Sequence, residues 1–287
     1  MNAPLYPLQY EELVREALRE DLGRAGDLTT DAIVPRDQGA EGAILVRREG
    51  RIAGLEVALS AFRQLDPEAR FRILAGDGSD ASAAEIVAYV RASARALLSA
   101  ERVALNLLGR LSGIATATRD VVRRVEGTGA AIVCTRKTTP GLRALEKYAV
   151  RVGGGYNHRF GLDDAVLVKD NHRTLAGGVA AAVARVRERV GHMVKIEVEV
   201  DRLEELSEAL DLGVDVVLLD NMMLPMLREA VALARGRAKT EASGGITPET
   251  VRAVAETGVD MISLGWLTHS APSLDVSLEI EAEAPGS

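Results

Sequence analysis

The heptapeptide TRKTTPG at residues 135–141 places two adjacent cations and two threonines directly after the apolar run AAIVC. A charged pair at the end of a buried run carries a desolvation penalty unless a ligand or a partner compensates it. Lysine is a compact point charge suited to phosphate oxygens, whereas arginine holds a planar carboxylate through two parallel hydrogen bonds. Arg136 and Lys137 therefore indicate an anionic ligand, to which Thr138 and Thr139 are expected to add hydroxyl donors.

Polar residues or glycines also follow five later apolar runs. The whole set comprises Arg136, Lys137, Lys169, Asp170, Glu197, Glu199, Asp220, Asn221, Ser243, Gly244, Gly245, Gly265 and His269. In βα barrels the reacting groups stand at the carboxyl ends of the strands, so these positions are considered together. A single polar strand end is most simply a solvated one. Six in succession favour a ligand site.

The segment RVGGGYNHRFGLDD, residues 151–164, adds His158 and Arg159 in a stretch whose three glycines permit close backbone approach. A lone histidine is more often packed or solvent-facing than ligand-binding. Because His158 stands beside Arg159 in a glycine-rich segment, a ligand-binding role and a structural role are given equal weight. Together with Lys169, these cations predict a polyanionic ligand.

Carboxylates dominate the middle strand ends. Glu197 and Glu199 are two residues apart in a strand and so point to one face, and Asp220 ends the next run. Carboxylates bind ribose hydroxyls or Mg²⁺, which usually takes one or two of them plus phosphate oxygens. The alternative is that they neutralise nearby lysines, an interpretation that competes strongly for Glu197 and less for Asp220.

Small residues mark the last two strand ends. SGG at 243–245 precedes ITPET, which predicts glycines at the amino terminus of a helix, where free N–H groups favour a phosphate. Gly265 ends the final run. The expected layout has cations at one end, carboxylates in the middle and the glycine site opposite, as a phosphoribosyl donor beside an acidic acceptor would require.

The elements that must position these residues alternate regularly from about residue 130. Short Val-, Ile- and Leu-rich runs end near 135, 169, 199, 220, 243 and 265 and are separated by helical patterns. Strands buried on both faces by crossover helices have this composition, so a parallel sheet is predicted. About six βα units favour a closed or nearly closed barrel, with a doubly wound sheet as the alternative.

The first hundred residues lack this alternation and suggest an α+β domain, beginning with a helix over about 9–21. The segment SAERVALNLLGRLSGIATATRDVVRRVEG predicts helices broken near Gly109 to Gly113, as a hinge into the barrel. The alternating tail LDVSLEIEAEA is expected to return to the first domain as a strand or a helix. We assign residues 1–112 and 271–287 to this domain and 113–270 to the barrel.

Composition excludes several classes. The 287 residues are 47% hydrophobic with a net charge of −7, which supports a soluble globular protein and disfavours nucleic-acid binding. Neither a membrane span nor a signal-peptide pattern is found, so a cytoplasmic location is expected. The single Cys134 excludes an intramolecular disulfide and makes a zinc site improbable. Of the five lysines, Lys147 and Lys195 are expected to be solvated at strand edges.

Segments spanning nearly the whole chain closely resemble the quinolinate phosphoribosyltransferase family. They are EDLGRAGDLTT, SAERVALNLLGRLSGIAT, TRKTTPGLRALEKYAVRVGGGYNHRFGLDDAVLVKDNH, EVEV, LLDN, EASGGI and LGWLTHSAP. The resemblance implies an amino-terminal sandwich and an incomplete α/β barrel. It also implies a homodimer, or a higher oligomer of dimers, in which one subunit's sandwich covers the barrel mouth of the other.

The resemblance further implies the substrates quinolinate and 5-phosphoribosyl 1-diphosphate, with Mg²⁺ as cofactor. The products would be nicotinate mononucleotide, pyrophosphate and CO₂, made for NAD synthesis. Catalytic roles would fall on Lys137, Lys169, Glu199 and Asp220, of which Glu199 and Asp220 would also hold the metal. The residues implied to bind quinolinate are Arg136, His158, Arg159, Lys169 and, from a partner subunit, Arg102. Those implied to bind the donor phosphate are Ser243, Gly244, Gly245, Gly265 and His269.

Three other interpretations stay open at this point. A member of the same fold could take a different acidic acceptor, because carboxylate-binding arginines do not specify the ring. An aldolase could use Lys169 or Lys195 as a Schiff base. The third is a non-catalytic sensor of a phosphorylated ligand, which the complete acidic set disfavours.

Overall fold

A computed structural model describes residues 4–282 of the chain, which divide into two compact units. Unit 1 comprises residues up to 119, 139–154 and those from 270 onward, and unit 2 comprises 120–138 and 155–269. Residues 283–287, which include the last two of the predicted returning tail LDVSLEIEAEA, lie outside the described range.

Unit 1 is built on a four-stranded antiparallel sheet in the order β12-β1-β5-β3. The strands are β1 Gly39–Val46, β3 Arg70–Ile73, β5 Ile86–Ser93 and β12 Val276–Ala282. β12 pairs with β1 from Val46↔Val276 onward, so the alternating tail does return to the first domain, as a strand. A small ribbon, β2 Gly50–Arg51 with β4 Asp80–Ala81, completes the strands of this unit.

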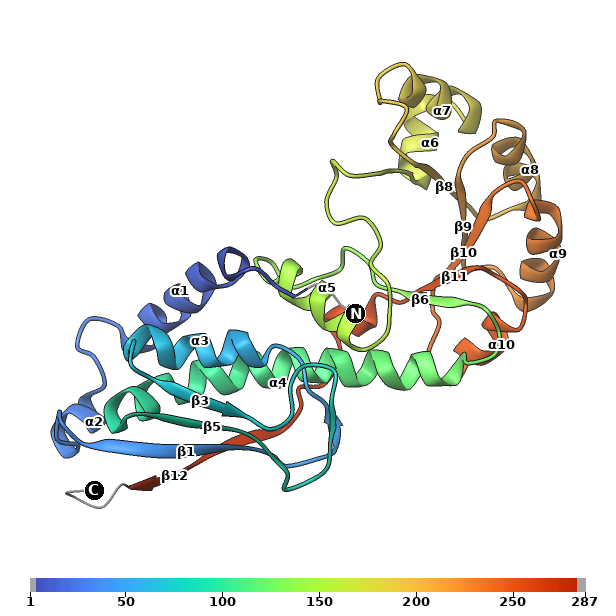
Figure 1. Ribbon diagram of the computed structural model, residues 1–287. Helices are drawn as coiled ribbons and strands as arrows, with labels where there is room; N and C mark the ends of the chain where they lie inside the picture. Colours follow the sequence, from blue (N-terminus) through green and yellow to red (C-terminus); the bar gives the residue numbers. More distant parts are fainter. Residues whose placement is uncertain (1–3, 283–287) are drawn as a thin grey trace. The chain divides into compact units, whose positions relative to one another are not determined.

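Helices cover this sheet, and Figure 1 shows α3 and α4 along the same side of it. The helical elements are η1 Pro7–Gln9, α1 Glu11–Leu22, α2 Leu28–Ile33, α3 Leu55–Leu65, α4 Ala94–Arg124 and α5 Arg143–Val152. α1 matches the helix predicted over about 9–21. Ile44 of β1, Leu59 and Phe62 of α3 and Leu97 of α4 are fully buried and form part of the core.

The break predicted near Gly109 to Gly113 is wrong, because α4 continues through both glycines. Their reason is close packing rather than bending. A Cβ at Gly109 would lie 2.8 Å from the carbonyl oxygen of Leu274, and one at Gly113 would lie 2.1 Å from that of Pro272. Glycine lets the returning chain pass directly against the helix.

Unit 2 contains a six-stranded sheet in which every paired neighbour is parallel. Its strands are β6 Ala131–Val133, β7 Val166–Val168, β8 Ile196–Val200, β9 Val216–Asp220, β10 Lys239–Ser243 and β11 Met261–Ser263. Its helices are α6 Asp170–Ala176, α7 Val179–Arg187, α8 Leu203–Asp211, α9 Leu224–Ala234, α10 Val251–Ala255 and α11 Trp266–His269. α7, α8 and α9 lie on the outside of the curved sheet (Figure 1). Central positions of β8 and β9 are buried in succession, as two-sided covering requires.

Strand order decides between the barrel and the doubly wound sheet. The order is β6-β11-β10-β9-β8-β7, so the strands follow in sequence and the first pairs with the last. In a doubly wound sheet the order of the strands along the chain reverses near the middle of the sheet. β6 and β7 end the sheet, and the segment at Tyr156 bridges to Val133 of β6. The structure therefore confirms an incomplete barrel with an additional sheet domain.

The helix after β6 departs from the barrel rhythm, because α5 is grouped with unit 1. Its fully buried Glu146 forms an ion pair with Arg110 of α4. Its Tyr148 hydroxyl donates to Asp77, which also accepts the amino-terminal N–H groups of Gly54 and Leu55 at α3. α5 is thus tied to unit 1 by buried polar contacts as well as by apolar packing.

Two lysines give opposite outcomes. Lys195 is solvent-exposed beside β8 and pairs with Asp215, as expected of a strand-edge lysine. Lys147 is 1% exposed and lies within α5, so its prediction as a solvated residue is wrong. Its position follows from that of α5, whose residues 145–150 are all buried.

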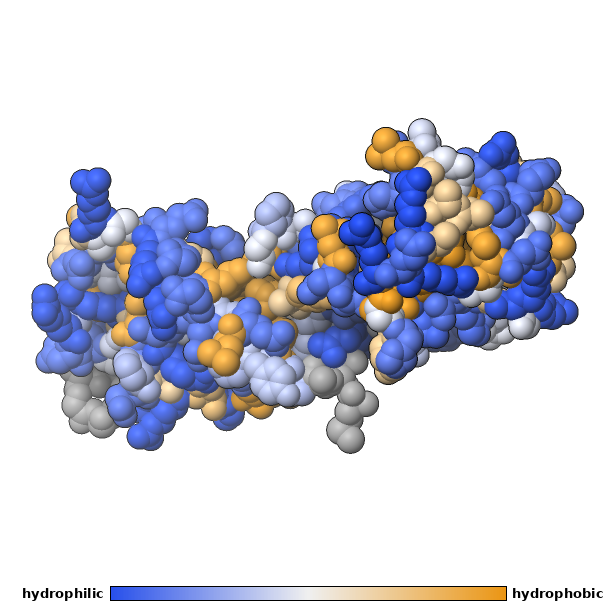
Figure 2. Space-filling model, turned by 90° about the horizontal axis from the view of Figure 1, so that it is seen from above, coloured by the Kyte–Doolittle hydropathy of each residue, from blue (hydrophilic) through white to orange (hydrophobic). Residues whose placement is uncertain are grey.

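Hydrophilic residues predominate on the face shown in Figure 2, and hydrophobic residues form scattered patches between them. Among residues 4–282, no helix combines the length and the apolar composition that crossing a membrane requires.

Candidate active site

A cavity of about 800 Å³ opens at the carboxyl ends of the unit 2 strands. Twelve of the thirteen predicted site residues line it. They are Arg136, Lys137, His158, Arg159, Lys169, Glu199, Asp220, Ser243, Gly244, Gly245, Gly265 and His269. The exception is Arg102, which is exposed on α4 in unit 1. Residues from positions 136 to 269 meet here because all six strands end at one edge of the barrel.

Two arginines approach each other at one side of this cavity. Arg136 follows β6, and Arg159 lies in the segment before β7, where its Nη1 donates to the carbonyl oxygen of Ala165. Burial, followed by the charge of Arg136, lowers the pKa of Arg159. Neighbouring cations that repel each other are stabilised by an anion placed between them, so this side of the cavity suits a carboxylate.

Lys137 lies beside the last strand of the barrel. Its N–H donates to the Thr135 hydroxyl, and its carbonyl oxygen accepts from the Thr268 hydroxyl. A Cβ at Gly265 would lie 2.9 Å from Cδ of Lys137, so the glycine makes room for the lysine stem.

The predicted linear layout is therefore wrong in one respect. The glycines are not opposite all the cations, because pairing of β6 with β11 brings Lys137 next to Gly265. Around the barrel, Lys169 after β7 is followed by the carboxylates of β8 and β9. The glycine loop after β10 comes next, and then Lys137.

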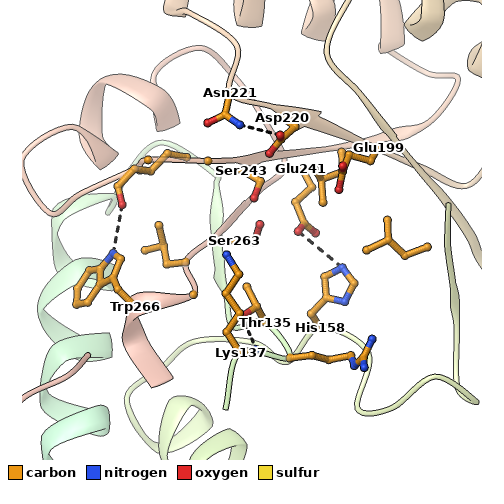
Figure 3. Close-up of a pocket in the computed structure, with 18 of the residues that line it drawn as sticks. Thr135, Lys137, His158, Glu199, Asp220, Asn221, Glu241, Ser243, Ser263 and Trp266 are labelled. Atoms are coloured by element: carbon orange, nitrogen blue, oxygen red, sulfur yellow. Dashed lines mark hydrogen bonds and ion pairs between the residues drawn. The ribbon is translucent and has the colours of Figure 1, made fainter. Parts of the chain in front are cut away.

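Carboxylates occupy the centre of the cavity (Figure 3). Glu199 Oε2 lies 3.0 Å from Nζ of Lys169. Asp220 Oδ2 accepts from the side-chain amide of Asn221 at 2.7 Å. Burial, followed by the charge of Glu199, raises the pKa of Asp220. The two negative carboxylates repel each other. A divalent cation bound between them would offset this repulsion, and their oxygens are suitable ligands for it.

The glycine loop 243–245 has the open backbone expected of an anion site, but its support differs from the prediction. Gly244 and Gly245 have φ values of +95° and +59°. The helix expected directly after them begins only at Val251 and has five residues. Any anion binding therefore depends on the loop N–H groups and on nearby cations, because the glycines are not at a helix terminus.

Asn221, which the sequence placed among the strand-end residues without a role of its own, links Asp220 to the glycine loop. Its backbone N–H donates to the Ser243 carbonyl, and its own φ is +53°. Its Oδ1 occupies the space where a Gly244 side chain would stand, 2.2 Å from a Cβ built there. The asparagine thus orients Asp220 and holds the glycine loop at the same time. Its position directly after Asp220, in LLDN, was the available signal.

A buried cluster lies next to Arg159. His158 Nε2 is 2.8 Å from Glu197 Oε2 and 3.7 Å from Glu241 Oε1, and Figure 3 shows the Glu241 carboxylate facing the ring. The N–H of Arg159 donates to the other ring nitrogen. His158 is therefore a cavity residue with a fixed ring orientation. Glu197 pairs with this histidine, so the lysine-neutralising interpretation of Glu197 is wrong.

Glu241 was missed although a signal existed. It lies two residues before Ser243 in the same strand, so both point to one face, as Glu197 does relative to Glu199. Seven further residues outside the predicted set line the cavity: Thr135, Leu167, Leu218, Ile246, Ser263, Leu264 and Trp266.

Thr139 has a different role from the one expected. The Thr139 hydroxyl donates to Glu146 Oε1 at 2.8 Å, and its N–H donates to Oε2 of the same carboxylate. Thr139 and Glu146 both belong to unit 1. Its hydroxyl therefore anchors the turn after Lys137.

Taken together, an α/β barrel whose strand ends combine cations, carboxylates and a glycine loop defines a class of proteins that bind phosphorylated anionic ligands. Two family models cover most of the chain. The amino-terminal domain of quinolinate phosphoribosyl transferase matches residues 27–112, and its carboxyl-terminal domain matches 114–279. The chain belongs to the quinolinate phosphoribosyltransferase family.

Individual relatives agree. A probable nicotinate-nucleotide pyrophosphorylase (carboxylating) of Bacillus subtilis is 46% identical over 273 residues, covering 95% of this chain and 94% of the relative. One of Methanothermobacter thermautotrophicus is 41% identical, covering 94% and 98%. The crystal structure of NadC from Streptococcus pyogenes is 40% identical with a TM-score of 0.95, covering 98% of this chain and 100% of that one.

The fit of Asn221 against Gly244 is testable. We expect Gly244→Ala to destabilise the protein by about 2–3 kcal/mol, because it adds a clash to the strain of a positive φ. Gly245→Ala is the matched control, since a Cβ there meets nothing within 4 Å, and should cost about 1 kcal/mol. Denaturant unfolding gives both values. In an Asn221→Ala background the Gly244→Ala penalty should shrink, and an unchanged penalty would contradict the assigned contact.

Proposed function

We propose that this protein transfers the phosphoribosyl group of 5-phosphoribosyl 1-diphosphate to quinolinate. The reaction releases pyrophosphate and CO₂ and forms nicotinate mononucleotide for NAD synthesis. The observation that carries the proposal is a single cavity lined by the cations, the carboxylates and the glycine loop that such a reaction needs. The family assignment supports the same chemistry.

The acceptor subsite is assigned to Arg136, Arg159 and His158. Quinolinate carries two adjacent carboxylates on a pyridine ring, and two arginines held close together match such a dianion. The lowered pKa of Arg159 reflects burial and the nearby Arg136, and a bound carboxylate would relieve the second cause. Lys169, at the cavity edge, faces both this subsite and the carboxylates.

The donor subsite is assigned to the other side of the cavity. Ser243, Gly244 and Gly245 would hold the ribose 5-phosphate through loop N–H groups, with Gly265 and His269 beside them. Lys137, adjacent to Gly265, is placed to contact phosphate oxygens. Glu199 and Asp220 would position the ribose hydroxyls.

The central carboxylates also fit Mg²⁺. Glu199 and Asp220 are hard oxygen donors, and the raised pKa of Asp220 marks uncompensated negative charge. When bound, Mg²⁺ would neutralise charge on the diphosphate oxygens. Lys137 and Lys169 would stabilise the same oxygens from either side of the carboxylates, and Asn221 would keep Asp220 in its orientation.

The chemistry requires no protein nucleophile. The pyridine nitrogen attacks the anomeric carbon, the bond to the diphosphate oxygen breaks, and positive charge develops on the ribose. Alkylation leaves the ring nitrogen positively charged. When the adjacent carboxylate leaves as CO₂, its electron pair stays on the ring carbon, where the positive nitrogen stabilises it, and a proton from solvent then forms the C–H bond. The arginines then serve to align the dianion, which lowers the entropic part of the barrier.

The aldolase alternative has weak support in the site. Lys195 lies outside the cavity lining and pairs with Asp215. Lys169 forms an ion pair with Glu199 through Nζ, the atom that a Schiff base would need. The other enzymatic alternative, a different acidic acceptor, is distinguished from quinolinate by the activity assay with nicotinate described below.

A homodimer with shared active sites, or a higher oligomer of such dimers, is part of the proposal. Arg102 is exposed on α4 and does not line the cavity of its own unit 2. We assign it to the acceptor subsite of a partner chain, as the family resemblance implies. A cytoplasmic location is also proposed, because a phosphorylated donor is too strongly charged to cross a bilayer unaided.

The central test is product formation. Purified protein mixed with quinolinate, 5-phosphoribosyl 1-diphosphate and Mg²⁺ should release labelled CO₂ and yield nicotinate mononucleotide by chromatography. Excess EDTA should lower the rate by on the order of 100-fold, because the diphosphate leaves without charge neutralisation. Nicotinate is the control acceptor. Turnover of nicotinate but not of quinolinate would contradict the proposed acceptor, and binding of both substrates without pyrophosphate release would indicate a sensor.

The arginine pair has a binding test. Arg136→Ala and Arg159→Ala should each weaken quinolinate binding by about 2–3 kcal/mol, or roughly 30- to 150-fold, because a buried carboxylate loses its charged partner. Equilibrium titration measures the affinity, with exposed Arg228→Ala of α9 as the matched control. Unchanged affinity in both variants would remove the arginines from the acceptor subsite.

The shared site has a complementation test. Arg102→Ala and Lys137→Ala should each be nearly inactive alone. After subunit exchange, each mixed dimer has one site carrying both substitutions and one carrying neither, so about a quarter of wild-type activity should return. Differently tagged chains show whether exchange has occurred. Exchange without recovery would place Arg102 in its own chain's site or in none.

A further inference from the structure

Glu241 is a buried titratable residue to which the proposed chemistry assigns no task. It stands in the middle of β10, is 2% exposed, and lines the cavity near His158 of the proposed acceptor subsite. One carboxylate oxygen from each of Glu241 and Glu197 and one ring nitrogen of His158 all lie within 4.8 Å of one another. A carboxylate in such a place needs a compensating interaction.

The contacts of Glu241 do not compensate a full negative charge. His158 Nε2 already lies 2.8 Å from Glu197 and is 3.7 Å from Glu241. The Ser263 hydroxyl supplies a hydrogen bond, but Oε1 of Glu241 finds no hydrogen-bond partner. Burial, followed by the charge of Glu197, raises the pKa of Glu241 to about 7, although His158 and Ser263 act in the opposite direction.

We propose that Glu241 is a positioning residue of the acceptor subsite. It carries a proton when the dianionic acceptor is bound, and it holds the neighbouring His158–Glu197 pair in place. The inference rests on the proposed function, since it concerns the same subsite. A protonated Glu241 is neutral, so the cluster around His158 carries one negative carboxylate, that of Glu197, instead of two. An ionised Glu241 would repel the acceptor and oppose the arginines.

Other charged groups around the cavity bear on this proton. β8 contributes Glu197 and Glu199, and β9 contributes Asp220, all of which favour protonation of Glu241. β11 contributes only the neutral Ser263 near it. The cations that favour ionisation come from the segments after β6 and before and after β7: Arg136, Lys137, His158, Arg159 and Lys169. A bound dianion offsets those cations and so favours the proton further.

Binding of the acceptor should therefore be linked to proton uptake above pH 7. In the free protein Glu241 loses its proton as the pH rises through about 7. Acceptor binding raises that pKa, so a proton returns on binding at pH 8 but not at pH 6. His158 is also ionisable, so the uptake due to Glu241 is measured as the difference between wild type and Glu241→Gln, whose side chain resembles a permanently protonated glutamic acid.

The test is calorimetric titration of quinolinate into EDTA-treated protein, in buffers of different ionisation enthalpy, from pH 6 to pH 8.5. At pH 8 the wild type should take up about 0.5–1 proton per site more than Glu241→Gln, and its affinity should fall up to about tenfold more between pH 7 and pH 8. Glu229→Gln, at an exposed position of α9, should behave as the wild type. Equal proton uptake in wild type and Glu241→Gln would overturn the proposal.

Two further measurements keep the result interpretable. Ser263→Ala retains the carboxyl but removes its hydrogen bond, so the uptake profile should move to higher pH, and an unmoved profile counts against the proposal. If a difference between wild type and Glu241→Gln appears only after a divalent metal is added, a cation rather than a proton offsets the charge, and the proposal is wrong.

Thermal unfolding without ligand separates this inference from the proposed function. A raised folded-state pKa means that the stability contributed by Glu241 is complete below the unfolded-state value and is lost as the pH rises through about 7. The Tm of Glu241→Gln should therefore exceed that of the wild type by about 5 °C at pH 8, and by less at pH 5.5. Parallel Tm curves would overturn the proton assignment. Failure of quinolinate to bind, with the pH-dependent Tm difference intact, would instead reject the proposed acceptor and with it the acceptor linkage.

Discussion

The arrangement of unit 2 depends on one constraint: parallel strands of a barrel all end at the same edge, where the main chain stops pairing with itself. Side chains at those ends converge on a shared interior of limited volume, so their charges act strongly on one another. Glu199 and Lys169 satisfy each other there. Asp220 and Glu241 do not, and their raised pKa values record the remaining imbalance.

That imbalance is what suits the cavity to ligands. Arg136 and Arg159 are held close together with like charge, and the carboxylates of β8, β9 and β10 are held close with the opposite charge. A diphosphate with its metal ion and a dicarboxylate would supply the missing counter-charges. Substrate binding would then relieve the repulsion between like-charged groups in the folded protein. Packing elsewhere in the barrel stabilises the fold against this repulsion.

Glycine and asparagine set the geometry of the anion loop. Gly244 cannot carry a side chain because Asn221 fills that space, and Asn221 adopts a left-handed backbone that few other residues tolerate. A similar fit occurs in unit 1, where Gly113 lets the chain at Pro272 cross α4. The missing Cβ makes room for a side chain at Gly244 and for a crossing backbone at Gly113, and the second case explains why the glycines near 109–113 do not break a helix.

Period, composition and strand-end chemistry were enough to predict the parallel sheet, the incomplete barrel and twelve residues of one cavity, because local patterns of burial are written directly in a chain. Contacts between distant strands were not predictable in this way. Pairing of β6 with β11 placed Lys137 beside Gly265, and three separate segments brought His158, Glu197 and Glu241 together. Such contacts depend on strand order and register, which arise only when the whole barrel forms. For the same reason only the tertiary structure decided which carboxylates carry a negative charge that their neighbours do not offset.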